Sequence, residues 1–280
     1  MSDAEEPIPQ SDLPARFAMG VLMIGVALVA TIWGGWWFRA LVAAAVAIML
    51  VEWADMHKVP RRWAYVAAAL TAATLLGAAE YLYATGEQVD EVPEELTAAL
   101  FDPNWLGFAA FAVPALIAGL LSRRPAMAWG VLYIGIPSFA LLSLSWAWET
   151  LVLWVFAVTW ATDILAYFAG RAIGGPKLAP GISPNKTWAG LIGGMVGAGL
   201  FGWLVATWFE MEPIFLWAGA LMGAIAQAGD LYESWVKRRA GVKDSGTMLP
   251  GHGGVLDRLD GLLAVAIATT LLLMAGLWTG

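Results

Sequence analysis

Acidic and basic side chains alternate in one polar stretch of the sequence, residues 229–260, beside an apolar segment. Four aspartates and five Lys or Arg residues lie in it, and a purely structural cytoplasmic loop would not need the aspartates. If that part is helical, one face carries four polar residues spaced three or four apart: Asp230, Glu233, Ser234 and Lys237. Asp257 and Asp260 share a face for the same reason. Carboxylates in twos and threes suit Mg²⁺, which takes substrate phosphates among its other ligands.

The same stretch has features that suit a phosphate. Glycines flank His252 and allow backbone N–H groups to approach an anion, just ahead of a helix start where the helix dipole favours negative charge. Lys and Arg side chains would complete a phosphate cradle. The stretch therefore predicts a metal-assisted site for a phosphorylated substrate.

Acidic residues elsewhere divide into two groups. Asp163 lies deep in an apolar segment, where a carboxylate is costly and marks a functional or water-lined position by default. Glu52, Asp55 and Glu80 lie near the ends of apolar segments, where solvation explains them. Within the polar stretch, Glu233 is expected to contribute to function through the structure of the loop.

Apolar segments must position these residues. The chain has 280 residues, of which 60% are hydrophobic and 13% charged, and this composition indicates a protein that resides in lipid. We predict an all-α polytopic membrane protein with about nine spans. They lie near residues 16–34, 36–53, 63–84, 105–121, 126–147, 151–170, 187–208, 214–231 and 260–278. We expect a single membrane domain, with an N-terminal region 1–150 and a region 151–280 that carries the catalytic loops.

The positions of Lys and Arg predict the orientation. With nine spans, nearly all the Lys and Arg outside the apolar segments fall on one side, and Arg39 alone opposes them. We expect an integral protein of the inner (plasma) membrane with its N-terminus and active-site loops in the cytoplasm. The net charge of −7 gives no reason to expect a nucleic-acid partner, and the lack of cysteine excludes disulfides and thiolate metal sites.

Residues 234–260 resemble the signature of the phosphatidate cytidylyltransferase (CDP-diacylglycerol synthase) family. The resemblance is carried by Ser234-x-x-Lys237-Arg238, then Lys243-Asp244-Ser245-Gly246, and then Leu249-Pro250-Gly251-His252-Gly253-Gly254-x-x-Asp257-Arg258-x-Asp260. Upstream, Asp163 to Arg171, Ser183-Pro184-Asn185-Lys186-Thr187 and Gln227-x-Gly229-Asp230-Leu231 are similar to accompanying motifs of the family. One departure is Ala189-Gly190, where the family commonly has Glu-Gly.

The resemblance implies an activity in membrane phospholipid biosynthesis. CTP and phosphatidate would give CDP-diacylglycerol and pyrophosphate with Mg²⁺, in a largely helical membrane protein that forms a homodimer, and a monovalent cation is compatible with the site. Asp230, Asp257 and Asp260 would bind the metal, with Asp163 and Asp244 as second candidates. Phosphates would be held by Lys237, Arg238, Lys243, Arg258 and Lys186. His252 would orient a phosphate or protonate the leaving pyrophosphate.

The remaining substrate contacts would come from small polar residues and glycines of the two motifs: Ser183, Asn185, Ser234, Ser245, Gly253 and Gly254. Two other functions stay open. A CTP-dependent lipid or polyprenol kinase would use a similar setting but transfer the γ-phosphoryl group to a hydroxyl. A membrane transporter would place its charges near the bilayer midplane, between broken helices.

Overall fold

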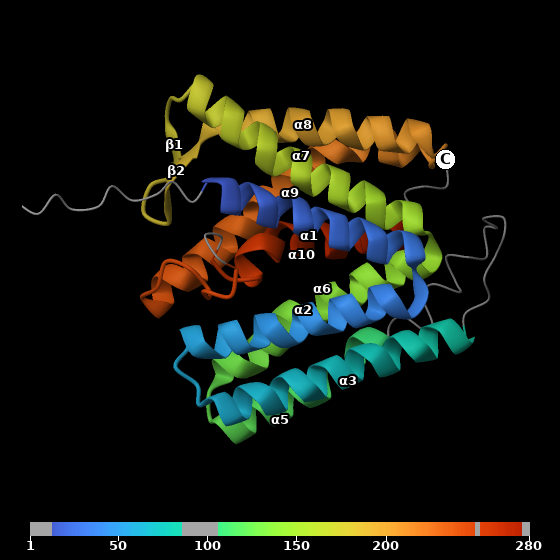
Figure 1. Ribbon diagram of the computed structural model, residues 1–280, viewed down its shortest axis with the longest axis vertical. Coiled ribbons are helices and arrows are strands. Elements are labelled where there is room, and N and C mark those ends of the chain that lie inside the picture. The colour runs from blue at the N-terminus through green and yellow to red at the C-terminus, as the bar shows by residue number, and fades with distance from the viewer. Residues whose placement is uncertain (1–12, 86–105, 250–252, 276–280) are drawn as a thin grey trace, which may run out of the picture.

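Long apolar helices make up most of the computed structural model, which describes residues 13–85, 106–249 and 253–275 (Figure 1). The helices are α1 (Leu13–Trp33), α2 (Gly35–Met56), α3 (Arg61–Thr85), α5 (Ala112–Ser122), α6 (Pro125–Ala147), α7 (Glu149–Ala172), α8 (Trp188–Trp208), α9 (Pro213–Ala240) and α10 (Leu256–Met274). Two short antiparallel strands, β1 (Lys177–Ala179) and β2 (Ser183–Thr187), form a hairpin between α7 and α8.

A helix lies at each predicted span, but the count of nine crossings is not confirmed. Within the described residues, six helices are long and apolar enough to cross a membrane: α2, α3, α6, α7, α8 and α9. Shorter apolar helices cover Ala18–Trp33 and Leu106–Ser122. The hairpin was not expected in an all-α chain. It falls where the sequence predicted a loop, because its strands are too short for a periodic pattern.

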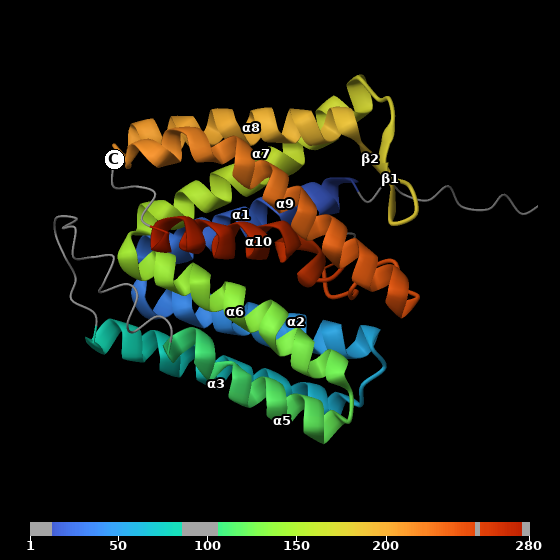
Figure 2. The same cartoon turned by 180° about the vertical axis from the view of Figure 1, so that it is seen from behind.

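The connections alternate between the two ends of the helix bundle (Figures 1 and 2). The α2–α3 connection, the α5–α6 connection, the β-hairpin and the α9–α10 connection lie at one end, and these carry the Lys and Arg residues that predicted the orientation. The α1–α2, α6–α7 and α8–α9 connections lie at the other end. The chain thus gathers its basic connections on one side, as the sequence predicted.

Small residues allow α8 to approach its neighbours closely. A Cβ added to Gly190 would lie 3.1 Å from the carbonyl oxygen of Ala166 on α7, and one added to Gly194 would lie 3.1 Å from that of Thr162. Helices in membranes associate through such small-residue contacts, because burial of apolar surface gives little driving force in lipid. Gly190 is therefore explained by packing.

Arg39, the one basic residue that opposes the predicted orientation, lies in α2 and is buried beside α3. Its guanidinium donates to Glu80 at 2.6 Å and stacks 3.8 Å from the ring centroid of Tyr83. Glu80 is 58% exposed, so its interpretation as a solvated span-end residue is confirmed, and its carboxylate also pairs with Arg39. The last helix, α10, packs against α9 and α7 on one side and α6 on the other, and so joins the later helices of the chain to α6.

Candidate active site

The polar stretch begins inside a helix. The α9 helix continues to Ala240, beyond the span end predicted near residue 231, because the charged turns form intrahelical pairs that a hydropathy pattern does not register. It ends at Gly241, whose φ of 78° is the left-handed conformation that favours glycine. The predicted helical face is confirmed: the Ser234 hydroxyl donates to Asp230 at 3.3 Å. The Lys237 ammonium donates to Glu233 at 2.8 Å.

A buried ion triad joins α9 to α10. The Lys237 ammonium lies 2.8 Å from Glu233 and 2.6 Å from Asp257, and the three side chains are 10%, 0% and 6% exposed in that order. The prediction that Glu233 contributes through loop structure is wrong, because Glu233 lies within α9 and is buried in the triad with α10. Burial on its own would raise the pKa of Asp257, but hydrogen bonds from Lys237 and from the Gly254 N–H outweigh it and lower the pKa. Asp257 is therefore ionised near neutral pH.

The β-hairpin carries the Ser183–Thr187 motif and places it against α9. The Lys186 ammonium lies 2.6 Å from a carboxylate oxygen of Asp230. The Arg238 guanidinium donates to the carbonyl of Ile182 at 3.2 Å. Thr187 accepts the N–H of Gly190 and so caps α8 at the end of the hairpin. The Ser183–Thr187 motif and the polar stretch 229–260, which are far apart in the sequence, therefore meet at Asp230.

Further acidic residues surround this meeting point. Asp163 of α7 lies close enough to Asp230, Lys186 and Arg258 for their charges to interact. Asp260 of α10 lies within electrostatic reach of Asp230 and Glu233. The structure therefore brings together the acidic residues predicted on α7, α9 and α10.

The loop between α9 and α10 is wrapped around two carboxylates. Asp257 accepts the backbone N–H of Ser245 at 2.9 and 3.1 Å and that of Gly254 at 2.7 Å. Glu52 of α2 accepts the N–H groups of Val255 and Leu256, each at 2.9 Å. The sequence predicted that the N–H groups of the glycines around His252 approach a substrate anion. Of these glycines, Gly254 donates to Asp257 instead, and Gly251 lies outside the described residues.

Glu52 is the residue that sequence reasoning missed. It was assigned to solvent as a span-end residue, but it is buried against the signature loop. A glutamate that follows an apolar run is the only signal in the sequence, and no spacing rule connects it to residues about 200 positions later. Tyr133 of α6 is a second such residue, since its hydroxyl lies near Asp260 and Glu233.

The other predicted site residues lie at the surface or outside the described residues. Lys243, Asp244 and Asn185 are exposed, as is Arg258. Ser245 is buried, and its hydroxyl donates to Glu52 at 3.4 Å. His252 falls in 250–252, outside the described residues. Gly253 has a φ of 84°, and a Cβ there would lie 2.7 Å from Asp257, so only glycine suits this turn.

The acidic residues fit Mg²⁺ by the chemistry of their oxygens. The buried Tyr133 Oη makes no hydrogen bond within the described part of the chain, and the buried Glu233 carboxylate lies against that of Asp260. Buried carboxylates in such proximity are costly unless a cation offsets their charge. Within residues 13–85, 106–249 and 253–275, however, no three His, Asp or Glu side chains are grouped as a ligand set. The shared metal site therefore remains a prediction.

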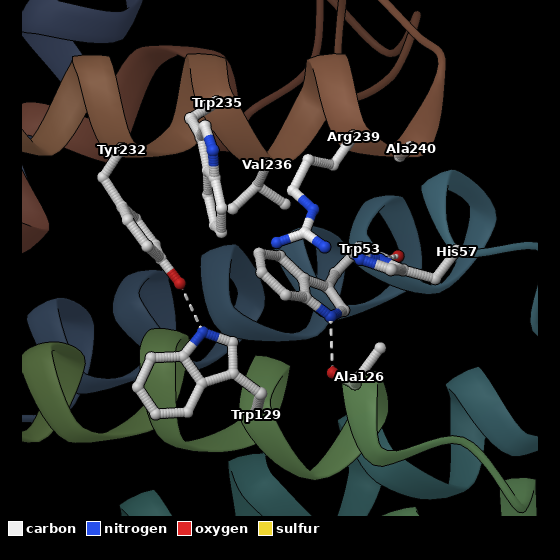
Figure 3. A pocket seen from close by; sticks show the side chains of 9 residues that line it. All are labelled: Trp53, His57, Ala126, Trp129, Tyr232, Trp235, Val236, Arg239 and Ala240. Carbon is white, nitrogen blue, oxygen red and sulfur yellow. Dashed lines mark hydrogen bonds between the residues drawn. The ribbon is translucent and has the colours of Figure 1, made fainter.

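An aromatic recess of about 410 Å³ lies against α9 (Figure 3), on the face of this helix that points away from the ion triad. Trp235 and Arg239 line it from α9, Trp129 from α6 and Trp53 from α2. These α9 positions are about half a helical turn away from Asp230 and Lys237, so the recess and the acidic cluster point in different directions. The recess is not part of the site.

Comparisons with known proteins agree with the motifs. Residues 14–275 match the cytidylyltransferase family. A phosphatidate cytidylyltransferase of Brucella abortus biovar 1 is 56% identical over 122 residues, which are 42% of this chain and 44% of that protein. One from Rickettsia conorii is 35% identical over 179 residues, 61% of this chain and 72% of that protein. The chain thus matches less than half the length of the first of these relatives.

Proposed function

Because the chain belongs to the cytidylyltransferase family, we propose that it transfers the cytidylyl group of CTP to phosphatidate, giving CDP-diacylglycerol and pyrophosphate. The observation that supports this function best is the meeting of both motifs at one place, where Lys186 pairs with Asp230 next to the Lys237 triad. A site for two phosphorylated substrates requires such a concentration of opposite charges at the level of lipid headgroups.

In this reaction a phosphate oxygen of phosphatidate attacks the α-phosphorus of CTP, and the bond from that phosphorus to the bridging oxygen of the β-phosphate breaks. The nucleophile is already an anion near neutral pH, so the reaction needs alignment and charge neutralisation and no dedicated base. The exposed side chains of Lys243 and Arg258 would hold phosphates, together with Arg238 at the hairpin. Lys186 and Lys237 already neutralise carboxylates and would hold the acidic cluster in place.

Asp230 and Asp260 would hold Mg²⁺, with Asp163 beside them, and Asp257 would combine a metal contact with its role as a loop anchor. The ion would neutralise the negative charge that develops on the triphosphate. The homodimer, the monovalent cation and the inner-membrane location implied by the resemblance belong to the same proposal.

The basic end of the bundle is proposed to face the cytoplasm, where CTP is available. The chain has no cysteine, so the single substitutions Gln88→Cys and Ala179→Cys each give a probe without background. An impermeant thiol reagent added to intact cells should label only Gln88→Cys. Labelling of Ala179→Cys alone would contradict the orientation and move the site away from CTP.

The fate of labelled CTP distinguishes this function from the two alternatives. With phosphatidate and purified protein, α-labelled CTP should put label into a chloroform-soluble lipid, and label at the γ-position should leave as pyrophosphate. A kinase would give the reverse pattern and require a lipid with a free hydroxyl. Label in neither lipid would contradict both transferases and favour a transporter.

A further inference from the structure

The carboxylate of Glu52 connects the N-terminal half of the chain to the signature loop. Glu52 lies four residues before the end of α2 and is only 6% exposed. One carboxylate oxygen accepts the N–H of Val255 and the other accepts that of Leu256, each at 2.9 Å, across more than 200 residues of sequence. The Ser245 hydroxyl donates to the same carboxylate at 3.4 Å.

These contacts supply what the α10 helix lacks. The residue before α10, Val255, has a helical conformation and makes no side-chain cap hydrogen bond. The first N–H groups of a helix need acceptors, and the helix dipole favours a negative charge there. Glu52 provides both from another helix. It therefore fixes the position at which α10 begins, one residue before Asp257.

The loop is shaped to fit around Glu52. A Cβ on Gly246 or on Gly254 would lie 2.7 Å from an oxygen of the Glu52 carboxylate, so both positions need glycine. The neighbouring Trp53 holds this part of α2 against α6: its indole N–H donates to the Ala126 carbonyl at 2.8 Å (Figure 3). A Cβ on Gly130 would lie 2.5 Å from the Trp53 ring, which shows how closely the two helices approach. Glu52 is therefore a rigid anchor.

We infer that Glu52 is a positioning residue for the transfer reaction, because it holds Ser245 and the start of α10 and so sets where Asp257 and Asp260 lie. This inference rests on the proposed function for its activity readout. A Glu52→Gln substitution keeps the size of the side chain but offers one oxygen to two N–H donors and turns an amide N–H₂ toward the other. The start of α10 should then open more often.

The test measures loop opening and turnover in the same full-length protein. Leu256 is fully buried, so Leu256→Cys gives a thiol that reacts only when the start of α10 opens. Adding Glu52→Gln should speed its labelling about ten-fold, and kcat should fall about a hundred-fold because misplacement by about 1 Å costs that much. KM for phosphatidate should stay within about two-fold, since the binding cations are unchanged.

Asp55→Asn is the matched control, because Asp55 is an exposed acid on the same helix that pairs with Arg61 at 3.0 Å. It should change neither labelling nor kcat. Native kcat in Glu52→Gln would overturn the inference, and so would a fall in kcat without faster labelling, since Glu52 would then act on substrate directly.

A milder variant keeps the inference testable if Glu52→Gln does not give a folded protein. Glu52→Asp retains the charge but is one methylene shorter, and should lie between the wild type and Glu52→Gln in both labelling and kcat. Wild-type values for both would overturn the inference. Labelling needs no substrate, so a wild-type protein that transfers no cytidylyl group would contradict the proposed function, while the labelling rates would still decide whether Glu52 anchors the loop.

Discussion

The substitution Asp260→Asn is expected to lower the rate of CDP-diacylglycerol formation by about a thousand-fold, as lost metal-held stabilisation of a transition state would. Asparagine keeps the size and polarity of the side chain but removes the charge. Asp260 lies beside Asp230 and Glu233, so this change would weaken the acidic cluster at its most crowded point. Expression and the size of the detergent-solubilised protein should hardly change, because removal of one of several adjacent negative charges relieves repulsion.

Asp55→Asn is the comparison variant, because Asp55 is an exposed acid that pairs with Arg61. A substitution of Glu233 would be less suitable, because Glu233 is buried in the ion triad and its loss would disturb the fold. The rate should be measured across a Mg²⁺ titration for Asp260→Asn, Asp257→Asn and the comparison variant. Near-native rates in both Asp257→Asn and Asp260→Asn would show that the metal assignment is wrong.

Lys237→Met should remove both activity and stability. Lys237 is the single cation between Glu233 and Asp257 in the described triad, and all three side chains are buried. Removing one member of a buried ion pair leaves an uncompensated charge and costs about 3–5 kcal/mol. The midpoint of thermal unfolding in detergent should fall clearly, and cytidylyl transfer should fall to background.

Lys243→Met provides the control for stability, because Lys243 is exposed and its loss should leave the unfolding midpoint nearly unchanged. Lys237→Arg keeps the charge and should recover part of the stability. If Lys237→Met unfolded at the same temperature as Lys243→Met, the triad would not stabilise the junction of α9 and α10.

Local patterns in the sequence predicted the helical parts of the site. Spacings of three and four residues placed Asp230, Glu233 and Lys237 on one face of α9, and a hydrogen bond and an ion pair confirm it. Apolar runs located the helices, and Lys and Arg located the end of the bundle where the site lies. Each of these predictions depends on residues that are close in the sequence.

Contacts between distant segments could not be predicted in this way. No pattern in the sequence indicates that Glu52 caps α10, because a carboxylate at the end of an apolar run looks the same whether it is solvated or buried. The pairing of Arg39 with Glu80 was not predicted either, because no spacing pattern connects residues on two different helices. The apolar span was predicted to end near residue 231 because hydropathy falls at Asp230, whereas intrahelical pairs continue α9 to Ala240.

The reverse reaction tests the central claim most directly. One phosphoanhydride replaces another in the proposed transfer, so the reaction should run backwards when pyrophosphate is supplied. Purified protein given CDP-diacylglycerol and labelled pyrophosphate should form labelled CTP and an equal amount of phosphatidate, with Mg²⁺ required. Failure to form labelled CTP, in a preparation that phosphorylates a lipid hydroxyl from CTP, would contradict the account.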